Sequence, residues 1–397
     1  MKSIDRFSVV FILMPIFFSA CKPSLREASD YQVISVNFED YLYSESMSEK
    51  ILSSTHFVQL ETNENCLIGE IKEIVVLPER IFVLDEDKSR AVFIFDAQGK
   101  WINTISRYGR GPDEYMEVTN IFFDDDAQLL NLVCRFDQKI MMFDINGELV
   151  RQQKLPGLFK QVAKTNFGYV ANAKTNKAPP QLTSSVIWLS TDFKIQHQAF
   201  PISDEWHGIS INSATEFAEY RNELYYFPSL SNYVYRLTRD SLVTAYKYDF
   251  GRQNFPEDWK TPDCFVPPMR INIWDRQRHI SGLETFKETD QYLICVVLFD
   301  GSYKIVFYCK TSETVETFYL LSNPFALVDF GKVSKITDNY IITIVDAESV
   351  LEVMNIPEDM LPEEYVVQQR YLKNAILRPI SDQIEENPIL CFYRLRQ

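Results

Sequence analysis

The 397-residue chain has few of the residues from which metal and redox sites are built. Its four histidines, His56, His197, His207 and His279, are scattered without H-x-x-x-H spacing, which argues against a histidine-based metal centre. None of its seven cysteines forms a C-x-x-C pair, so neither a zinc knuckle nor a thioredoxin-type site is indicated. We expect the six cysteines after Cys21 to be small buried hydrophobic residues, and the alternative is a disulfide in an oxidising compartment.

Long runs of basic or apolar residues are also missing. No lysine and arginine run could neutralise a phosphate backbone, and the net charge is −15, so nucleic acid is not an expected partner. After the N-terminal segment, no apolar run approaches the ~18 residues of a membrane-spanning helix. The G-x-S-x-G, Walker A and dinucleotide-binding patterns are absent, so no familiar motif marks the chain as an enzyme.

The first 20 residues have the pattern of a signal peptide. Lys2 and Arg6 precede the apolar run 9–18, which is too short for a stable membrane anchor. The segment Phe18-Ser19-Ala20-Cys21 resembles a bacterial lipobox, with Phe18 where leucine is usual. The resemblance implies lipidation of Cys21, a linker over 21–30, and lipid anchoring in the bacterial cell envelope, on the periplasmic side or at the outer membrane. The alternatives are an ordinary signal peptide or an N-terminal core segment.

An internal repeat indicates the fold. Residues 91–100 read AVFIFDAQGK and residues 139–148 read KIMMFDINGE, each an apolar strand followed by an Asp-x-x-Gly turn. Weaker copies occupy 186–200, 232–248, 304–320 and 388–396. Two further strand-like segments precede each copy, so each unit is interpreted as four short strands, the size of one propeller blade.

Six such units predict an all-β protein, a six-bladed β-propeller over residues 31–397. The longer spacings between copies require insertions at 251–279 and 357–388, and the second contains a predicted helix at 363–376. A spare strand before the first unit, 31–38 or 56–62, is expected to pair with the last unit and close the ring. A β-sandwich with an α/β domain is the alternative, disfavoured because helix signals are otherwise nearly absent.

The predicted helix at 363–376 forms the small helical insertion near the C-terminus. It places Val367, Tyr371 and Ala375 on one stripe, with Leu372 and Ile376 beside it. We expect this stripe to dock on the propeller. The alternative is that the helix forms a lid over the central channel.

Residues 107–115, RYGRGPDEY, resemble the Gly-x-Gly-Pro-[Gly]-[Glu/Gln]-[Phe/Tyr] segment of NHL-type propeller repeats. With the lipobox, FVQLET at 57–62 and NPIL at 387–390, the chain resembles the bacterial six-bladed β-propeller lipoproteins. It departs from the pattern at Asp113, which is often glycine, and its 12 glycines are few for NHL repeats. The resemblance implies fold and export and transfers no catalytic residue.

The same loop is the first candidate for a ligand site. Its arginines could hold a carboxylate or sulfate through paired hydrogen bonds, and its tyrosines could stack on a sugar or peptide. The alternative is a structural turn with solvated charges. The candidate ligand-binding residues are Arg107, Tyr108, Arg110, Glu114 and Tyr115.

Other candidates have equally ordinary explanations. The run Asp124-Asp125-Asp126 could bind Ca²⁺, the one cofactor considered, or could form a turn. The aromatic residues Trp206, Trp259 and Trp274, with His207, could form a sugar platform or pack loops onto the body. The carboxylates Asp85, Asp113 and Glu114 could act in acid–base chemistry, but nothing in the sequence pairs two of them at a defined distance.

Two functions therefore remain open. The first is an envelope-tethered binding or scaffolding propeller for a glycan, a peptide or a partner protein. The alternative is a propeller enzyme, a lyase, lactonase or glycosidase, with a polar or Ca²⁺ site at the central channel. An enzyme should bring three or more carboxylate, histidine or arginine side chains together at the channel mouth.

Overall fold

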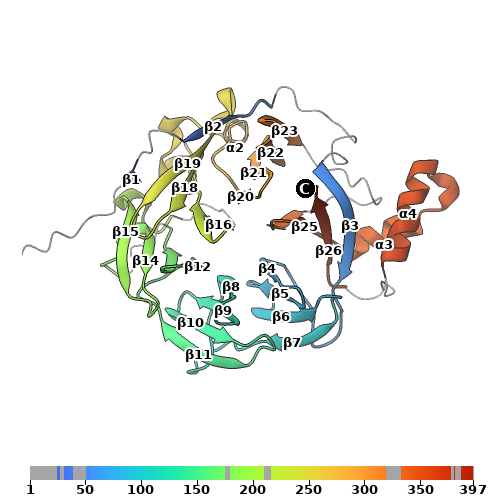
Figure 1. The fold of residues 1–397 in the computed structure, drawn as a ribbon, viewed down its shortest axis with the longest axis horizontal. Coiled ribbons are helices and arrows are strands. Elements are labelled where there is room, and N and C mark those ends of the chain that lie inside the picture. Colours follow the sequence, from blue (N-terminus) through green and yellow to red (C-terminus); the bar gives the residue numbers. More distant parts are fainter. Residues whose placement is uncertain are drawn as a thin grey trace, which may run out of the picture.

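The computed structural model describes residues 25–26, 31–38, 51–174, 179–209, 216–318, 332–376, 380 and 386–396. Six sheets are arranged radially around a central axis (Figure 1). The expected six-bladed β-propeller is confirmed. The signal peptide and Cys21 lie outside the described residues.

Each blade contains four antiparallel strands, numbered outward from the axis. Blades one and two are β4 (Glu73–Val76), β5 (Arg80–Asp85), β6 (Ala91–Asp96), β7 (Trp101–Ile105), and β8 (Asn120–Asp124), β9 (Leu129–Cys134), β10 (Lys139–Phe143), β11 (Leu149–Lys154). Blades three and four are β12 (Gln161–Thr165), β13 (Gly168–Asn172), β14 (Ser184–Leu189), β15 (Ile195–Pro201), and β16 (Phe217–Tyr220), β17 (Glu223–Tyr226), β18 (Tyr233–Leu237), β19 (Leu242–Asp249). Blades five and six are β20 (Thr285–Glu288), β21 (Tyr292–Phe299), β22 (Ser302–Cys309), β23 (Thr314–Phe318), and β24 (Lys332–Ile336), β25 (Tyr340–Val345), β26 (Ile389–Leu395), β3 (Leu52–Gln59).

The repeated apolar segments of the sequence all become the third strand of a blade. The Asp-x-x-Gly turn that follows behaves as its chemistry predicts. Asp96 Oδ1 accepts hydrogen bonds from the backbone N–H of Gln98 and Lys100, at 2.9 and 2.8 Å, and Gly99 has a φ of 78°. The turn thus fixes the register between third and fourth strands.

The alternating strand direction gives the ring two distinct faces. We call top the face on which the outer strand of one blade leads to the inner strand of the next. The turns between second and third strands also lie on the top face. The turns between first and second strands, and between third and fourth, lie on the bottom face.

The last blade closes the ring with a strand from the N-terminal part of the chain. β3 pairs antiparallel with β26, with Leu52 opposite Leu395 and Gln59 opposite Ile389. The closing strand is therefore the second of the two expected segments. The other, 31–38, contains β2 (Gln32–Ser35), which pairs in parallel with β19 on the outside of blade four, as does β1 (Leu25–Arg26).

The hydrophobic core lies between neighbouring blades. Phe82 and Leu84 of blade one pack with Leu130 and Leu132 of blade two, all fully buried. Similar clusters join the other blades, so each blade buries both of its faces. This explains why the middle strands are apolar on both sides instead of alternating.

Three α-helices lie in the described chain: α2 (Ile273–Gln277), α3 (Ala347–Asn355) and α4 (Glu363–Ala375). The sequence predicted α4 alone. The lid interpretation is wrong, because α3 and α4 lie on the outer rim beside β26 and β3 (Figure 1). None of the described helices is long and apolar enough to span a membrane.

The contacts of α4 differ from the predicted stripe. Leu372 and Ile376 are buried in the core of blade six, whereas Val367 is exposed. The buried Gln369 donates from Nε2 to the carbonyl oxygens of Val353 and Ile356, both at 2.8 Å, and so satisfies the C-terminal end of α3.

Candidate functional site

A polar pocket opens on the bottom face where blades four, five and six meet. Its volume is about 600 Å³, within the range of small-molecule sites. It is formed by the first bottom turn of each of these blades together with the end of β26. Its lining residues are Glu219, Tyr220, Arg221, Asn222, Lys287, Thr289, Asp290, Gln291, Tyr292, Asp338, Asn339, Leu395 and Arg396.

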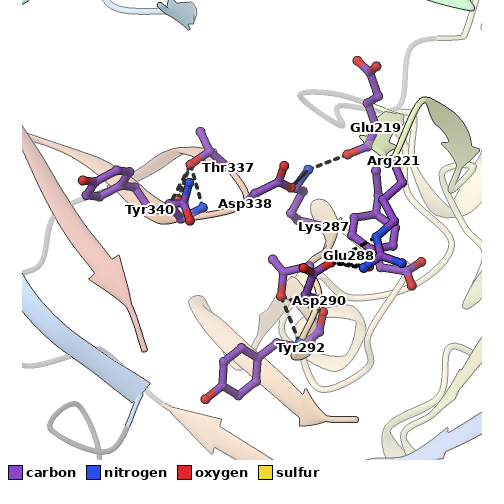
Figure 2. A network of polar contacts seen from close by, with 12 residues as sticks. Glu219, Arg221, Lys287, Glu288, Asp290, Tyr292, Thr337, Asp338 and Tyr340 are labelled. Atoms are coloured by element: carbon purple, nitrogen blue, oxygen red, sulfur yellow. Dashed lines mark hydrogen bonds and ion pairs between the residues drawn. The ribbon is translucent and has the colours of Figure 1, made fainter. Parts of the chain in front are cut away.

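Two of the three turns have the same sequence pattern, Thr-Asp-x-Tyr. They occupy residues 289–292 and 337–340. The hydroxyl of Thr289 accepts a hydrogen bond from the N–H of Tyr292, and that of Thr337 accepts one from the N–H of Tyr340, both at 2.9 Å (Figure 2). Each threonine therefore fixes its turn and places the following aspartate on the bottom surface.

Asp290 is the centre of the contact between blades four and five. Its carboxylate accepts hydrogen bonds from the Tyr220 hydroxyl at 2.7 Å and from Arg221 Nη2 at 2.8 Å. These hydrogen bonds hold the pKa of Asp290 below its usual value, and the one from Tyr220 has the largest effect. Burial of the carboxylate acts in the opposite direction. The carboxylate is therefore ionised at neutral pH and keeps an exposed edge for a ligand.

Lys287 connects the same group to blade six. Its Nζ forms an ion pair of 2.7 Å with Asp338 and donates to the Glu219 carbonyl oxygen at 2.5 Å (Figure 2). Burial raises the pKa of the Glu219 carboxyl, against the opposing effect of Lys287. One lysine thus holds the pocket walls from three blades together.

The lining suits a polar ligand without a large net charge. Three acids, Glu219, Asp290 and Asp338, face three bases, Arg221, Lys287 and Arg396. Planar carboxylate, amide and guanidinium groups can each make two hydrogen bonds to neighbouring hydroxyls or to a peptide unit. Two tyrosines add flat apolar surface next to these groups.

Charged residues also gather at the top of the central channel. Lys72, Lys160, Glu216 and Glu284 directly precede the inner strands of four different blades. Burial lowers the pKa of Lys174, whose Nζ lies 3.9 Å from Glu216, and the charges of all four of these residues act on it. With Glu86, which forms ion pairs with Lys72 and Lys160, this charged group contains three carboxylates, the number set above for an enzyme.

A pair of glutamates stands out within this group. Glu86 forms ion pairs with Lys160 at 3.0 Å and Lys72 at 3.4 Å. Burial and the nearby charge of Glu86 raise the pKa of Glu117. A carboxyl group that keeps its proton more tightly beside one that is ion-paired is the arrangement found at many acid–base sites.

The predicted site at 107–115 lies on the top face, between β7 and β8, and has the contacts of a structural turn. Tyr115 is fully buried, and its hydroxyl lies 2.9 Å from the carbonyl oxygen of Arg90 and 3.0 Å from that of Ile105. Burial raises the pKa of Tyr115 to about 12. Tyr115 therefore cannot stack on a ligand, and this part of the prediction is corrected.

The other four residues of that loop are not brought together around a cavity. Arg107 lies over the Phe143 ring at 5.8 Å, and Arg110 is exposed. Tyr108 is covered on one face by the guanidinium of Arg90 at 4.5 Å. Glu114 accepts a hydrogen bond from the N–H of Gly111 at 2.7 Å and so stabilises the turn. Ligand binding by these four residues stays a prediction.

The remaining candidates have structural contacts. Asp124 accepts hydrogen bonds from the N–H groups of Asp126 and Ala127 and from Lys164, as an aspartate turn does. Asp85 is fully buried and accepts from four backbone N–H groups. In the described part of the chain no three histidine, cysteine or acidic side chains are grouped to hold a metal ion.

The aromatic candidates divide into two groups. Trp206 packs against Phe265 of the 251–279 insertion at 6.0 Å, and Trp259 packs within the insertion against His279 at 4.9 Å. Trp274 is exposed. The six cysteines within the described residues are all free thiols; five are buried as expected, whereas Cys309 is partly exposed.

Residues 33–394 match a protein family described as "Domain of unknown function (DUF4934)", and the chain belongs to this family. No curated protein matches the sequence. The family description supplies an extent but no activity.

The first of three similar solved structures supports the same fold. The exported-protein candidate BF0058 of Bacteroides fragilis superposes with a TM-score of 0.71 at 16% identity, covering 92% of this chain and 100% of its own. A DUF4221 member from Bacteroides vulgatus has a TM-score of 0.44 at 10% identity, covering 87% and 97% of the two chains. The virginiamycin B lyase of Staphylococcus aureus has 0.41 at 13%, covering 68% and 75%. The last two scores are too low to support a functional argument.

Proposed function

We propose that this protein is a binding propeller of the bacterial envelope that holds a glycan in the bottom pocket between blades four, five and six. The observation that carries the proposal is the pocket itself, about 600 Å³ in volume, with acids, bases and amides placed beside two tyrosines. Vicinal hydroxyl groups pair with such planar polar groups, and the apolar face of a sugar ring packs on an aromatic ring. Lipidation of Cys21 would tether the propeller to the membrane.

The test measures glycan binding to the purified protein by array screening followed by calorimetry. Asp290→Asn removes a charge from the pocket and should weaken binding about tenfold or more, because hydrogen bonds to charged groups are the strong ones. The fold should persist, since the Asp290–Arg221 ion pair is exposed and contributes little stability.

A matched control is available on another blade. Asp192 also accepts from a hydroxyl, that of Ser190 at 2.6 Å, and pairs with a base, Lys194. Asp192→Asn should leave the affinity unchanged. If the protein binds peptides and not glycans, the pocket is a peptide-binding site. If the Asp290→Asn and Asp192→Asn variants bind the glycan with equal affinity, this pocket is excluded as the glycan site.

The alternative is a propeller enzyme, a lyase, lactonase or glycosidase, and the glutamates at the channel mouth favour it as the second candidate. Glu117, with its raised pKa, would act as the acid and Glu86 as its charged neighbour. Product formation from polysaccharides or lactones, lost in Glu117→Gln and retained in Asp290→Asn, would support this function. If both variants keep the activity, the result would oppose catalysis by these glutamates.

A further inference from the structure

A second pocket lies on the opposite, top face, between blades three and four. Its volume is about 290 Å³, and it shares no lining residue with the bottom pocket. More than half of its lining side chains are apolar or aromatic. The lining residues are Lys174, Ser185, Phe200, Pro201, Ile202, Ser203, Trp206, Glu216, Tyr226, Pro228, Ser229, Leu230 and Lys260.

The aromatic rings of this wall are held in place by other rings. Phe200 packs edge to face on Tyr226 and on Tyr235, with ring centroids 5.3 and 5.2 Å apart. Trp206 packs against Phe265 of the neighbouring insertion at 6.0 Å. The pocket is therefore formed before a ligand arrives, and its rings need not be ordered by binding.

The charged groups at the pocket are used within the protein. Lys174 forms an ion pair with Glu216, with 3.9 Å between the nitrogen and oxygen atoms. The Glu216 carboxylate also accepts hydrogen bonds from the N–H and the hydroxyl of Ser229. Lys260 forms an ion pair of 2.6 Å with Glu257. An ionic ligand would have to compete with these pairs, whereas a neutral ligand leaves them intact.

The hydroxyl groups of the wall are also engaged. Ser185 donates to the carbonyl oxygen of Phe200 at 3.3 Å, and Ser203 donates to Glu205 at 3.4 Å. Burial raises the pKa of Tyr226, so its hydroxyl stays neutral. The surface that the pocket offers to a ligand is thus mainly ring faces, ring edges and aliphatic carbons.

The size of the pocket limits the ligand. A volume of about 290 Å³ lies at the lower end of small-molecule sites. An apolar cavity of ~150 Å³ is already large enough for benzene. One ring with a short substituent, or two fused rings, therefore fits this pocket.

From these contacts we infer that the top pocket binds a neutral aromatic molecule of one or two rings, which packs against Phe200, Ile202 and Trp206. This site goes beyond the proposed glycan binding. It is separate from the bottom pocket, so each of the two proposals can fail without the other.

The experiment compares three probes of nearly equal shape by calorimetry on the purified protein: neutral benzyl alcohol, anionic benzoate and cationic benzylamine. Benzyl alcohol should bind about tenfold or more tightly than either ion, because a buried charge without a partner is costly. Cyclohexylmethanol, in which the ring is saturated, should bind about threefold or more weakly than benzyl alcohol, because it loses the edge-to-face contacts.

Variants assign the binding to this pocket. Ile202→Trp fills the pocket and should abolish binding of benzyl alcohol. Trp206→Ala removes one wall, so the affinity should fall about fivefold or more, and this variant decides the test if Ile202→Trp does not fold. Trp274→Ala, at an exposed tryptophan of the same top-face insertion, is the matched control and should leave the affinity unchanged. Asp290→Asn, in the bottom pocket, should also change nothing.

Thermal melting checks that each variant is folded. The inference is overturned if benzyl alcohol does not bind, or if either ion binds as tightly. It is also overturned if cyclohexylmethanol matches benzyl alcohol, or if Trp206→Ala binds like the wild type. Loss of benzyl alcohol binding in Asp290→Asn would place the probe in the bottom pocket and would equally overturn it.

Discussion

The side chain of Asn387 donates a hydrogen bond of 2.8 Å to the carbonyl oxygen of Cys66, a residue 321 positions earlier in the chain. The same amide group donates to Glu61 and accepts from the N–H of Ile68, both at 2.7 Å. Asn387 is almost fully buried and lies two residues before the start of β26. It therefore joins the last blade to the segment that leads into the first.

Replacing Asn387 should open this junction. Asn387→Ala removes three hydrogen bonds and leaves buried backbone groups without partners, so we expect the free energy of unfolding to fall by about 2–4 kcal/mol. Urea denaturation measures the change. Asn65→Ala, at an exposed asparagine in the same loop, is the control and should stay near the wild type. Similar losses in both variants would contradict this account of ring closure.

Tyr115 should matter for stability and not for binding. Tyr115→Phe deletes a hydroxyl that contacts two carbonyl oxygens, which should cost about 1–2 kcal/mol. Tyr108→Phe, at an exposed ring in the same loop, should change stability by less than about 0.5 kcal/mol. Chemical denaturation compares the two. A stable Tyr115→Phe protein that has lost ligand affinity would reinstate the loop as a binding site.

The channel glutamates should make stability depend on pH. Because the pKa of Glu117 is raised in the folded state, the folded protein binds this proton more tightly than the unfolded chain does. The contribution of Glu117 to the free energy of unfolding is thus present at low pH and is lost as pH rises above the usual glutamate range. Glu117→Gln should raise Tm at pH 7 by roughly 1–3 °C and leave it unchanged near pH 4.

Calorimetric or optical melting at the two pH values checks this prediction. Glu148→Gln serves as control, since Glu148 is exposed on the β10–β11 turn and the substitution should shift neither Tm. A lower Tm for Glu117→Gln at pH 7 would mean that the ionised carboxylate stabilises the channel mouth.

The blade repeat was predictable because its signals are local. Asp96 with Gly99 and Asp144 with Gly147 each specify a tight turn within a few residues, and both glycines have positive φ. Helix α3 was missed for the opposite reason. Its sequence, AESVLEVMN, directly follows strand β25 without a glycine or proline, and its valines suit a strand equally well.

The pocket could not be located because closure of the ring creates it. Arg221, Asp290 and Asp338 come from three separate blades, and no local pattern shows that they share one opening. A weak signal was present in the Thr-Asp-x-Tyr pattern, repeated at 289–292 and 337–340. Recognition of the repeated turn would have placed both aspartates on the same face.

The pairing of β3 with β26 also sets the order in which the molecule can form. Thr55 and Phe392, which are hydrogen-bonded across the last sheet, are 337 residues apart. Contacts of such long range make folding slow, and an unpaired strand edge invites association with other chains. During synthesis, β3 forms early and has no partner until the final strand has followed. A chain of this design therefore depends on rapid completion of the ring, or on a holding chaperone, for its yield.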